Sequence, residues 1–338
     1  MKKRILYVTI LLCTSLISVA CSKGDNKEEL DKNIDREIRE EDKEFTYDVE
    51  NPDAFCLDND GNLYALVDNI IKVFDDKGVY IKEYLIEEET IAPYLSIHED
   101  TIYFISLDSL YEFDLETETI KSLYQFEGEL FGFYGMVALE DSIFIIQRYR
   151  NDKEQEMVRY DENDWYSYEG EPLFHYDIVK NEMKTVNIPN IKLITKKNDT
   201  ELLIYAYDQE GGFYFTSYNS ISGDLGDKIY TDMKIDYISC MAYDYILDKV
   251  ICNNMEGLMV TDIRDTSNQT LYYPLTGMTG DGNSLQYLNG YTYYHMMQED
   301  GNKIIRIYNK AYIKDNPALK SYVLSSVGRS YRPDSFGY

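Results

Sequence analysis

From Phe45 onward, short apolar runs alternate with polar turns, and this pattern predicts an all-β fold. The clearest unit spans Ala54–Ile86, where four short apolar runs are separated by clusters of Asp, Asn, Gly and Lys. Such clusters supply the positive-φ backbone conformations that tight hairpin turns need. No long segment of this region has the 3.6-residue apolar period of a helix. Each unit is therefore predicted to be a four-stranded antiparallel sheet.

The same unit recurs along the chain, giving six units in succession, the last of them over Ser284–Leu324. The second strand of each unit is predicted to begin near residues 63, 102, 143, 202, 250 and 291. A period of about 40–48 residues, widened once by an insertion, is typical of four-stranded propeller blades. We therefore predict an all-β, six-bladed β-propeller over residues 45–338, with Phe45–Val49 joining the last blade to close the ring.

The first units also resemble a known group of proteins. The motifs Asp58-Asn-Asp-Gly-Asn-Leu-Tyr64, Ile71-Lys-Val-Phe-Asp75 and Gly78-Val-Tyr-Ile-Lys82 resemble repeats of six-bladed propellers of the NHL, TolB-like and SMP-30-like kind. The closest likeness is to bacterial six-bladed propeller lipoproteins. This resemblance implies a propeller fold and, within the broader group, activities that include partner binding, envelope assembly and, in some members, lactone hydrolysis.

The first twenty residues have the features of a secretory signal peptide. A cationic start, Met1–Arg4, precedes an apolar run over Ile5–Ala20, and charged residues resume directly after Cys21. Ser18-Val19-Ala20-Cys21 resembles the lipobox of bacterial lipoproteins, in which the cysteine thiol is acylated, with palmitate as a typical chain. We therefore expect residues 1–20 to be a lipoprotein signal peptide and Cys21 to carry the lipid. The alternative is an ordinary signal peptide or anchor with a coincidental cysteine.

Residues 21–44 are rich in Lys, Asp and Glu, and we expect a charged, partly helical tether. The whole chain has a formal net charge of −28 at pH 7, so we expect no binding to nucleic acid. The same charge gives no attraction to an anionic bilayer, and the lipid must provide the attachment to the membrane. The expected location is the cell envelope, outside the cytoplasm, and the expected state is a monomer.

Cysteine and histidine are too sparse to predict a disulfide framework or a metal site. Beyond Cys21, the mature chain holds only Cys56, Cys240 and Cys252, which we expect to be buried thiols, with a Cys240–Cys252 disulfide as the alternative. The three histidines are far apart and lack the spacing of zinc ligands. The sequence predicts no metal and no cofactor.

Motifs for catalysis are also missing from the sequence. The turn at Asp58–Asn62 fails the calcium-loop pattern, because positions 56 and 67 are Cys and Val. The Gly-rich stretch Thr279–Asn283 lacks the lysine of a phosphate loop. We therefore predict no catalytic residues, and the leading interpretation is a non-enzymatic binding or scaffolding module for an envelope protein or a small ligand. Two alternatives stay open: a metal-dependent, lactonase-like hydrolase, and a sensory or solute-capture component related to propeller-bearing solute-binding lipoproteins.

Two groups of aromatic residues are candidates for contact with a partner or ligand. The insertion Arg150–Pro172 combines many charges with aromatic side chains, which can anchor a protein interface. Its candidate partner contacts are Trp165, Tyr166 and Tyr168. Candidate residues for the channel rim fall near the starts of inner strands and are Tyr94, Tyr134 and Tyr237. The alternative for both groups is packing of the rings onto the blades.

Overall fold

A computed structural model describes most of the region from Glu44 to Tyr308 and divides the chain into two units, residues 1–43 and residues 44–338. The predicted signal peptide, Cys21 and the tether up to Lys43 lie outside the described residues. The described ranges are 44–88, 91–126, 130–149, 157–159, 166–168, 173–188, 190–208, 212–231, 240–254, 257–274, 278–279, 285–297 and 301–308. No helix of these ranges is long and apolar enough to cross a membrane.

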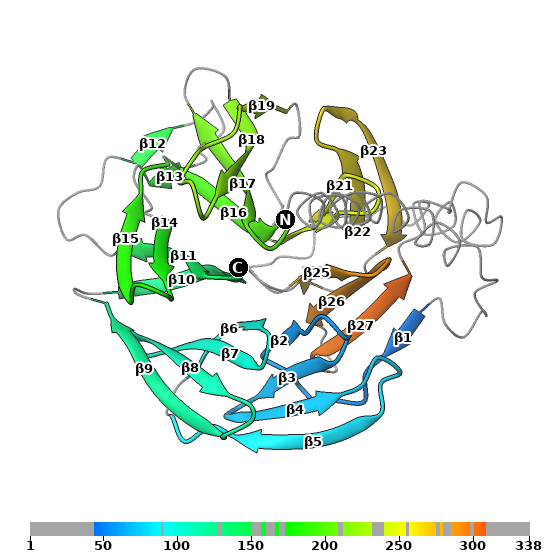
Figure 1. The fold of residues 1–338 in the computed structure, drawn as a ribbon. Helices are drawn as coiled ribbons and strands as arrows, with labels where there is room; N and C mark the ends of the chain where they lie inside the picture. The colour runs from blue at the N-terminus through cyan, green and yellow to red at the C-terminus, as the bar shows by residue number, and fades with distance from the viewer. Residues whose placement is uncertain are drawn as a thin grey trace, which may run out of the picture. The chain divides into compact units, whose positions relative to one another are not determined.

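The second unit is a six-bladed β-propeller, with the blades arranged around a common centre (Figure 1). From the centre outward, blade 1 contains β2 (Ala54–Leu57), β3 (Leu63–Val67), β4 (Ile70–Phe74) and β5 (Tyr80–Leu85). Blade 2 contains β6 (Ile91–His98), β7 (Thr101–Ser106), β8 (Ser109–Asp114) and β9 (Thr119–Gln125). Blade 3 contains β10 (Leu130–Leu139), β11 (Ser142–Tyr149), β14 (Leu173–Asp177) and β15 (Glu182–Val186).

The remaining three blades repeat this antiparallel order. Blade 4 contains β16 (Ile191–Lys196), β17 (Glu201–Asp208), β18 (Gly212–Asn219) and β19 (Ile229–Tyr230). Blade 5 contains β20 (Met241–Asp244), β21 (Lys249–Asn254), β22 (Gly257–Asp262) and β23 (Asp265–Pro274). Blade 6 contains β25 (Leu285–Leu288), β26 (Tyr291–Met297), β27 (Lys303–Tyr308) and β1 (Glu44–Thr46), with β24 (Met278–Thr279) also paired to β26.

The ring is closed by the first strand of the described chain. Strand β1 pairs antiparallel with β27, with Phe45 opposite Arg306, and the Tyr47 amide donates to the Ile304 carbonyl at 3.0 Å. The predicted closure by the Phe45 region is therefore confirmed. Strand β1 thus fills the outer position of blade 6, beside β27.

The predicted strand starts agree with the structure. The second strand of every blade begins within one residue of its predicted position, as at Leu63 in β3, Thr101 in β7 and Tyr291 in β26. The six-bladed, all-β prediction is thus confirmed. The insertion in blade 3 contains a hairpin of its own, formed by β12 (Met157–Arg159) and β13 (Tyr166–Tyr168).

Acidic and amide side chains form the turn that follows the third strand in five of the blades. Asp75 in blade 1 accepts hydrogen bonds from the amides of Lys77 and Val79 at 2.9 and 2.7 Å. The equivalent residues, each bonded to a backbone amide two or three positions further on, are Asp114, Asp177, Asn219 and Asp262. Such bonds stabilise tight turns, so part of the acidity of the chain has a local structural cause.

The core consists of six apolar clusters, one at each junction between neighbouring blades. In the junction of blades 1 and 2, Leu66 and Ile71 pack with Phe104, and all three are fully buried. A further cluster, with Tyr47, Phe74 and Tyr293, joins blade 6 to blade 1. Each blade therefore buries both faces against its neighbours, and no junction of the ring is left without a core.

Candidate functional site

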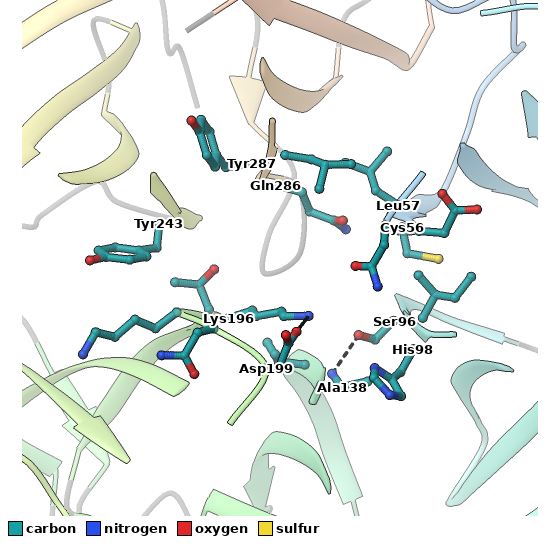
Figure 2. A pocket seen from close by; sticks show the side chains of 18 of the residues that line it. Cys56, Leu57, Ser96, His98, Ala138, Lys196, Asp199, Tyr243, Gln286 and Tyr287 are labelled. Atoms are coloured by element: carbon teal, nitrogen blue, oxygen red, sulfur yellow. Dashed lines mark hydrogen bonds and ion pairs between the residues drawn. The ribbon is translucent and has the colours of Figure 1, made fainter. Parts of the chain in front are cut away.

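A cavity of about 520 Å³ lies where the innermost strands of the six blades converge (Figure 2). All six inner strands, β2, β6, β10, β16, β20 and β25, contribute to its wall. The wall includes the last residues of these strands and, in several blades, the first residues of the turn that follows, such as Asp58, Glu99 and Asn289. Inner strands of a propeller run in the same direction, so their carboxyl ends gather at one end of the channel. The cavity is therefore an assembly of all six repeats.

Hydrogen bonds made by wall residues connect neighbouring blades. The Ser96 hydroxyl of β6 accepts a bond from the Ala138 amide of β10 at 2.8 Å, as Figure 2 shows. The Gln286 side-chain amide of β25 donates to the Phe55 carbonyl of β2 at 2.8 Å. The second bond joins the last blade to the first. Both side chains hold the shape of the cavity, because each fixes one inner strand against the next.

A charged group lines the wall on the side of blades 2 and 4. Lys196 and Asp199 form an ion pair at 2.7 Å, and His98 points toward them (Figure 2). The hydrogen bond and charge of Lys196 lower the pKa of Asp199, with a smaller contribution from His98. Lys197 pairs with Glu201 at 3.2 Å. These pairs leave the wall with charges of both signs and no strong excess of either.

Tyrosines line the wall on the side of blades 5 and 6. The Tyr245 hydroxyl donates to Asn289 at 2.8 Å, and the Tyr287 hydroxyl bonds to the carboxylate of the fully buried Asp244. The rings of Tyr245 and Tyr287 meet edge to face, with 5.2 Å between their centroids. Burial is the main reason why the pKa of both hydroxyls is raised. These rings are held in place and offer rigid aromatic surface to a ligand.

The turn at Asp58, which resembles part of a calcium loop, is occupied by its own hydrogen bonds. One carboxylate oxygen of Asp58 accepts from the Asp60 and Asn62 amides at 3.0 and 2.8 Å. The other oxygen accepts from the Asn62 side chain and the Tyr64 hydroxyl at 2.7 and 3.2 Å. All of these bonds stay within the turn and the strand that follows it. The carboxylate therefore serves the geometry of the hairpin.

The described residues contain no group of three or more His, Cys, Asp or Glu side chains that could hold a metal ion. A serine–histidine pair does exist, with Ser142 and His175 joined at 2.8 Å, but these residues are only 3% and 1% exposed. A substrate cannot reach a pair that is packed among apolar side chains. Cys56, Cys240 and Cys252 are buried and form no disulfide, so the alternative of a Cys240–Cys252 disulfide is not adopted.

The sequence-predicted site residues lie outside the cavity wall or outside the described side chains. Tyr94 of β6 is 6% exposed and packs in the cluster between blades 2 and 3. Tyr134 is part of β10, and Tyr166 and Tyr168 are part of β13, in each case with only the backbone described. Trp165, Tyr237 and Cys21 lie outside the described residues. Their roles remain predictions.

Sequence reasoning missed the cavity residues of the inner strands, such as Ser96, Lys196 and Gln286. The sequence does contain a signal for the cavity residues. They lie near the carboxyl end of the first strand in each repeat unit. Comparing that position across the six units would have pointed to the channel.

Comparisons with known proteins support the fold and leave the family open. No protein-family description and no curated protein matches the sequence. The β-propeller domain of Cps50 (Swd1) from Myceliophteria thermophila has a TM-score of 0.51 and 10% identity, over 78% of this chain and 99% of that one. The extracellular domain of the putative one component system BT4673 from B. thetaiotaomicron has a TM-score of 0.46 and 12% identity, over 78% and 40%. Oligogalacturonate lyase in complex with manganese has a TM-score of 0.48 and 10% identity, over 80% and 92%. The likeness to the Cps50 domain, at 10% identity, shows a shared propeller fold alone.

Proposed function

We propose that this protein is a lipid-anchored envelope propeller that binds a small ligand in the cavity at the centre of its ring. The observation that carries the binding proposal is the composition of the cavity wall. The wall combines apolar and aromatic residues, such as Met241, Leu285 and Tyr287, with polar residues such as Ser96 and Lys196. Polar and apolar surface contribute about equally to this wall, and small-molecule sites likewise combine apolar surface with polar groups that fix the orientation of a ligand.

The volume of the cavity fits the same proposal. About 520 Å³ lies within the range of about 300–1,000 Å³ that small-molecule sites occupy. The wall is built before any ligand arrives, since the bonds from Gln286 to Phe55 and from Tyr245 to Asn289 already fix its side chains. Such preorganisation reduces the entropy that is lost on binding.

Blocking the cavity tests the binding proposal. Asn59 and Asp60 are neighbouring exposed residues of one turn, and of the two only Asn59 lines the cavity. Small molecules that copurify with the native protein would be identified by mass spectrometry and added back in a calorimetric titration. Asn59→Trp should abolish their binding and Asp60→Trp should preserve it. Equal binding by both variants, or no bound molecule in any preparation, would refute the proposal.

Lipid attachment is tested separately by replacing the predicted acylation site. In Cys21→Ala the single thiol at the lipobox is lost, so the protein should leave the membrane fraction while its propeller remains folded. Circular dichroism of the released protein checks the fold. Retention of the variant in the membrane fraction would disprove attachment by this cysteine and leave the cavity proposal intact.

A further inference from the structure

The outer edge of blade 1 is unusually apolar for a surface strand. Strand β5 and the residue before it expose Val79, Tyr80, Ile81 and Leu85 to between 50% and 61%. These four residues lie within one seven-residue stretch, although the described chain has only ten exposed large hydrophobics. Strand β5 lies at the periphery of the ring (Figure 1), and within the described residues it pairs only with β4. Its outer edge is therefore open to another strand.

The neighbouring blade protects its outer edge in the usual way. In β9 the exposed positions are Thr119, Lys121, Ser122 and Gln125, all of them polar. In natural sheets, polar and charged residues on an edge strand prevent that strand from pairing with a strand of another chain. Strand β5 also exposes Lys82 and Glu83, but its other three exposed residues, Tyr80, Ile81 and Leu85, are apolar or aromatic, so its edge favours a covering segment.

A second copy of the chain fits this edge poorly. Antiparallel pairing around a two-fold axis aligns residues of the same face, because side chains alternate along each strand. A register centred on β5 then sets Lys82 opposite Lys82 of the copy, or Glu83 opposite Glu83. Like charges directly opposite each other destabilise a sheet. The covering segment is thus expected to have a different sequence.

A segment of suitable sequence follows directly after the last described strand. The predicted last unit extended to Leu324, yet the outer position of blade 6 is filled by β1. Residues 309–338 are consequently not needed to complete a blade. They include the run Leu319-Lys-Ser-Tyr-Val-Leu-Ser-Ser-Val327, which is rich in residues that favour strands.

Charge and position favour this segment further. Residues 309–338 carry five Lys or Arg residues against two Asp, although the whole chain has a net charge of −28. The edge at β5 carries Glu83 and is followed by Glu87 and Glu88. The segment also starts close by, because Arg306 of β27 donates a hydrogen bond to the Asp76 carbonyl in the turn that leads into β5.

The connection is long enough to reach the edge. Ten residues, 309–318, can span up to about 33 Å when extended. Strand β5 has six residues and is about 20 Å long. We propose that the segment Leu319–Val327 adds to the outer edge of β5 as a fifth strand of blade 1. The apolar side chains around Ile81 are then covered by Tyr322, Val323 and Leu324, and the acidic flank is neutralised by Lys320 and Arg329.

Hydrogen exchange tests this proposal directly. The full-length protein is compared with a variant that lacks residues 309–338, and exchange is followed in the peptide that covers residues 79–85. The added strand should slow exchange of the outward-facing amides at least about tenfold in the full-length protein, which corresponds to about 1.4 kcal/mol. Equal exchange in the two proteins would overturn the proposal. Protection that depends on protein concentration would also overturn it, because a second copy would then be the covering strand.

An edge variant provides the second measurement, in case truncation disturbs folding. Ile81→Lys places a charge on the apolar edge, and Val179→Lys makes the same change at a residue 74% exposed in the turn between β14 and β15. Trypsin cleavage after Lys320 and Arg329 should be accelerated about tenfold or more in Ile81→Lys, because the segment is released, and be unchanged in Val179→Lys. Equal cleavage rates in wild type and Ile81→Lys would overturn the proposal.

Discussion

The buried histidine of blade 3 should make the propeller sensitive to acid. His175 is 1% exposed; its Nε2 lies 2.8 Å from the Ser142 hydroxyl and its Nδ1 lies 3.4 Å from the Tyr218 hydroxyl. The ring of Phe144 packs against it at 4.5 Å between centroids. Burial in this setting, with a smaller effect of the Lys184 charge, lowers the pKa of His175 to about 4. The neutral ring is therefore the form that the folded protein holds.

The size of the effect follows from the difference between the folded and unfolded states. An unfolded histidine has a pKa of about 6.5, and each unit of difference corresponds to about 1.4 kcal/mol. Because the folded pKa is lowered, the stabilisation is fully present above pH 6.5 and is lost as the pH falls towards 4. Relative to neutral pH, His175 should lower the free energy of unfolding by about 2 kcal/mol at pH 5 and by about 3 kcal/mol below pH 4. Burial lowers the pKa of His295 as well, so its contribution has the same sign.

Urea denaturation at pH 7 and pH 5 measures this loss. His175→Gln removes the titrating group and keeps an amide that can bond to both hydroxyls, so its loss of stability between the two pH values should be about 2 kcal/mol smaller than that of the wild type. The comparison uses the change with pH, since the substitution also alters stability at pH 7. His98→Gln, at a partly exposed histidine of the cavity wall, provides the control. An identical pH dependence in wild type and His175→Gln would refute the reasoning.

Three further predictions concern stability and thiol chemistry. Phe144 is a fully buried core residue, and Phe144→Ala should reduce the free energy of unfolding by about 3–5 kcal/mol in chemical denaturation. Leu107 is 67% exposed, and Leu107→Ala should change the same free energy by less than about 0.5 kcal/mol. Gly78 and Gly223 have similar positive φ values of 78° and 75°, but an added Cβ collides with the Phe45 ring only at Gly78, so Gly78→Ala should lower the melting temperature more than Gly223→Ala. Equal shifts would show that the ring moves aside without cost. A thiol reagent should react slowly with the native protein and rapidly with the unfolded one, because Cys56, Cys240 and Cys252 are all buried. Burial raises the pKa of Cys252 to about 12 and that of Cys56 well above its usual value, so little reactive thiolate is present. Rapid labelling of the native protein would contradict this prediction.

The sequence predicted the blades well because their pattern is local. Apolar runs and turn residues such as Asp75 and Gly78 recur with the blade period, and each signal acts within a few neighbouring residues. Ring closure by β1 was also predictable, since a four-stranded final blade needs one more strand.

The cavity was not predictable from the same pattern. The rim prediction chose Tyr94 because it falls near the start of an inner strand. The pairing of β6 with β7 has a register shift between Ile91 and Leu95, and Tyr94 packs into the junction of blades 2 and 3. Such irregularities change which side chains face the channel, and the alternation of apolar residues does not reveal them. The Ser142–His175 pair was missed for a related reason, as it joins two strands on either side of the long insertion.

The closure of the ring has a consequence for how the protein is made. Strand β1 begins at Glu44 and its partner Ile307 is about 260 residues further along the chain. A chain that emerges amino-terminus first must carry β1 unpaired until β27 has appeared. During that time the cluster of Tyr47, Phe74 and Tyr293 cannot form, and blades 1 and 6 have no junction. Maturation should therefore be slow and end in one late step, in which the ring closes and the exposed faces of the first and last blades disappear together.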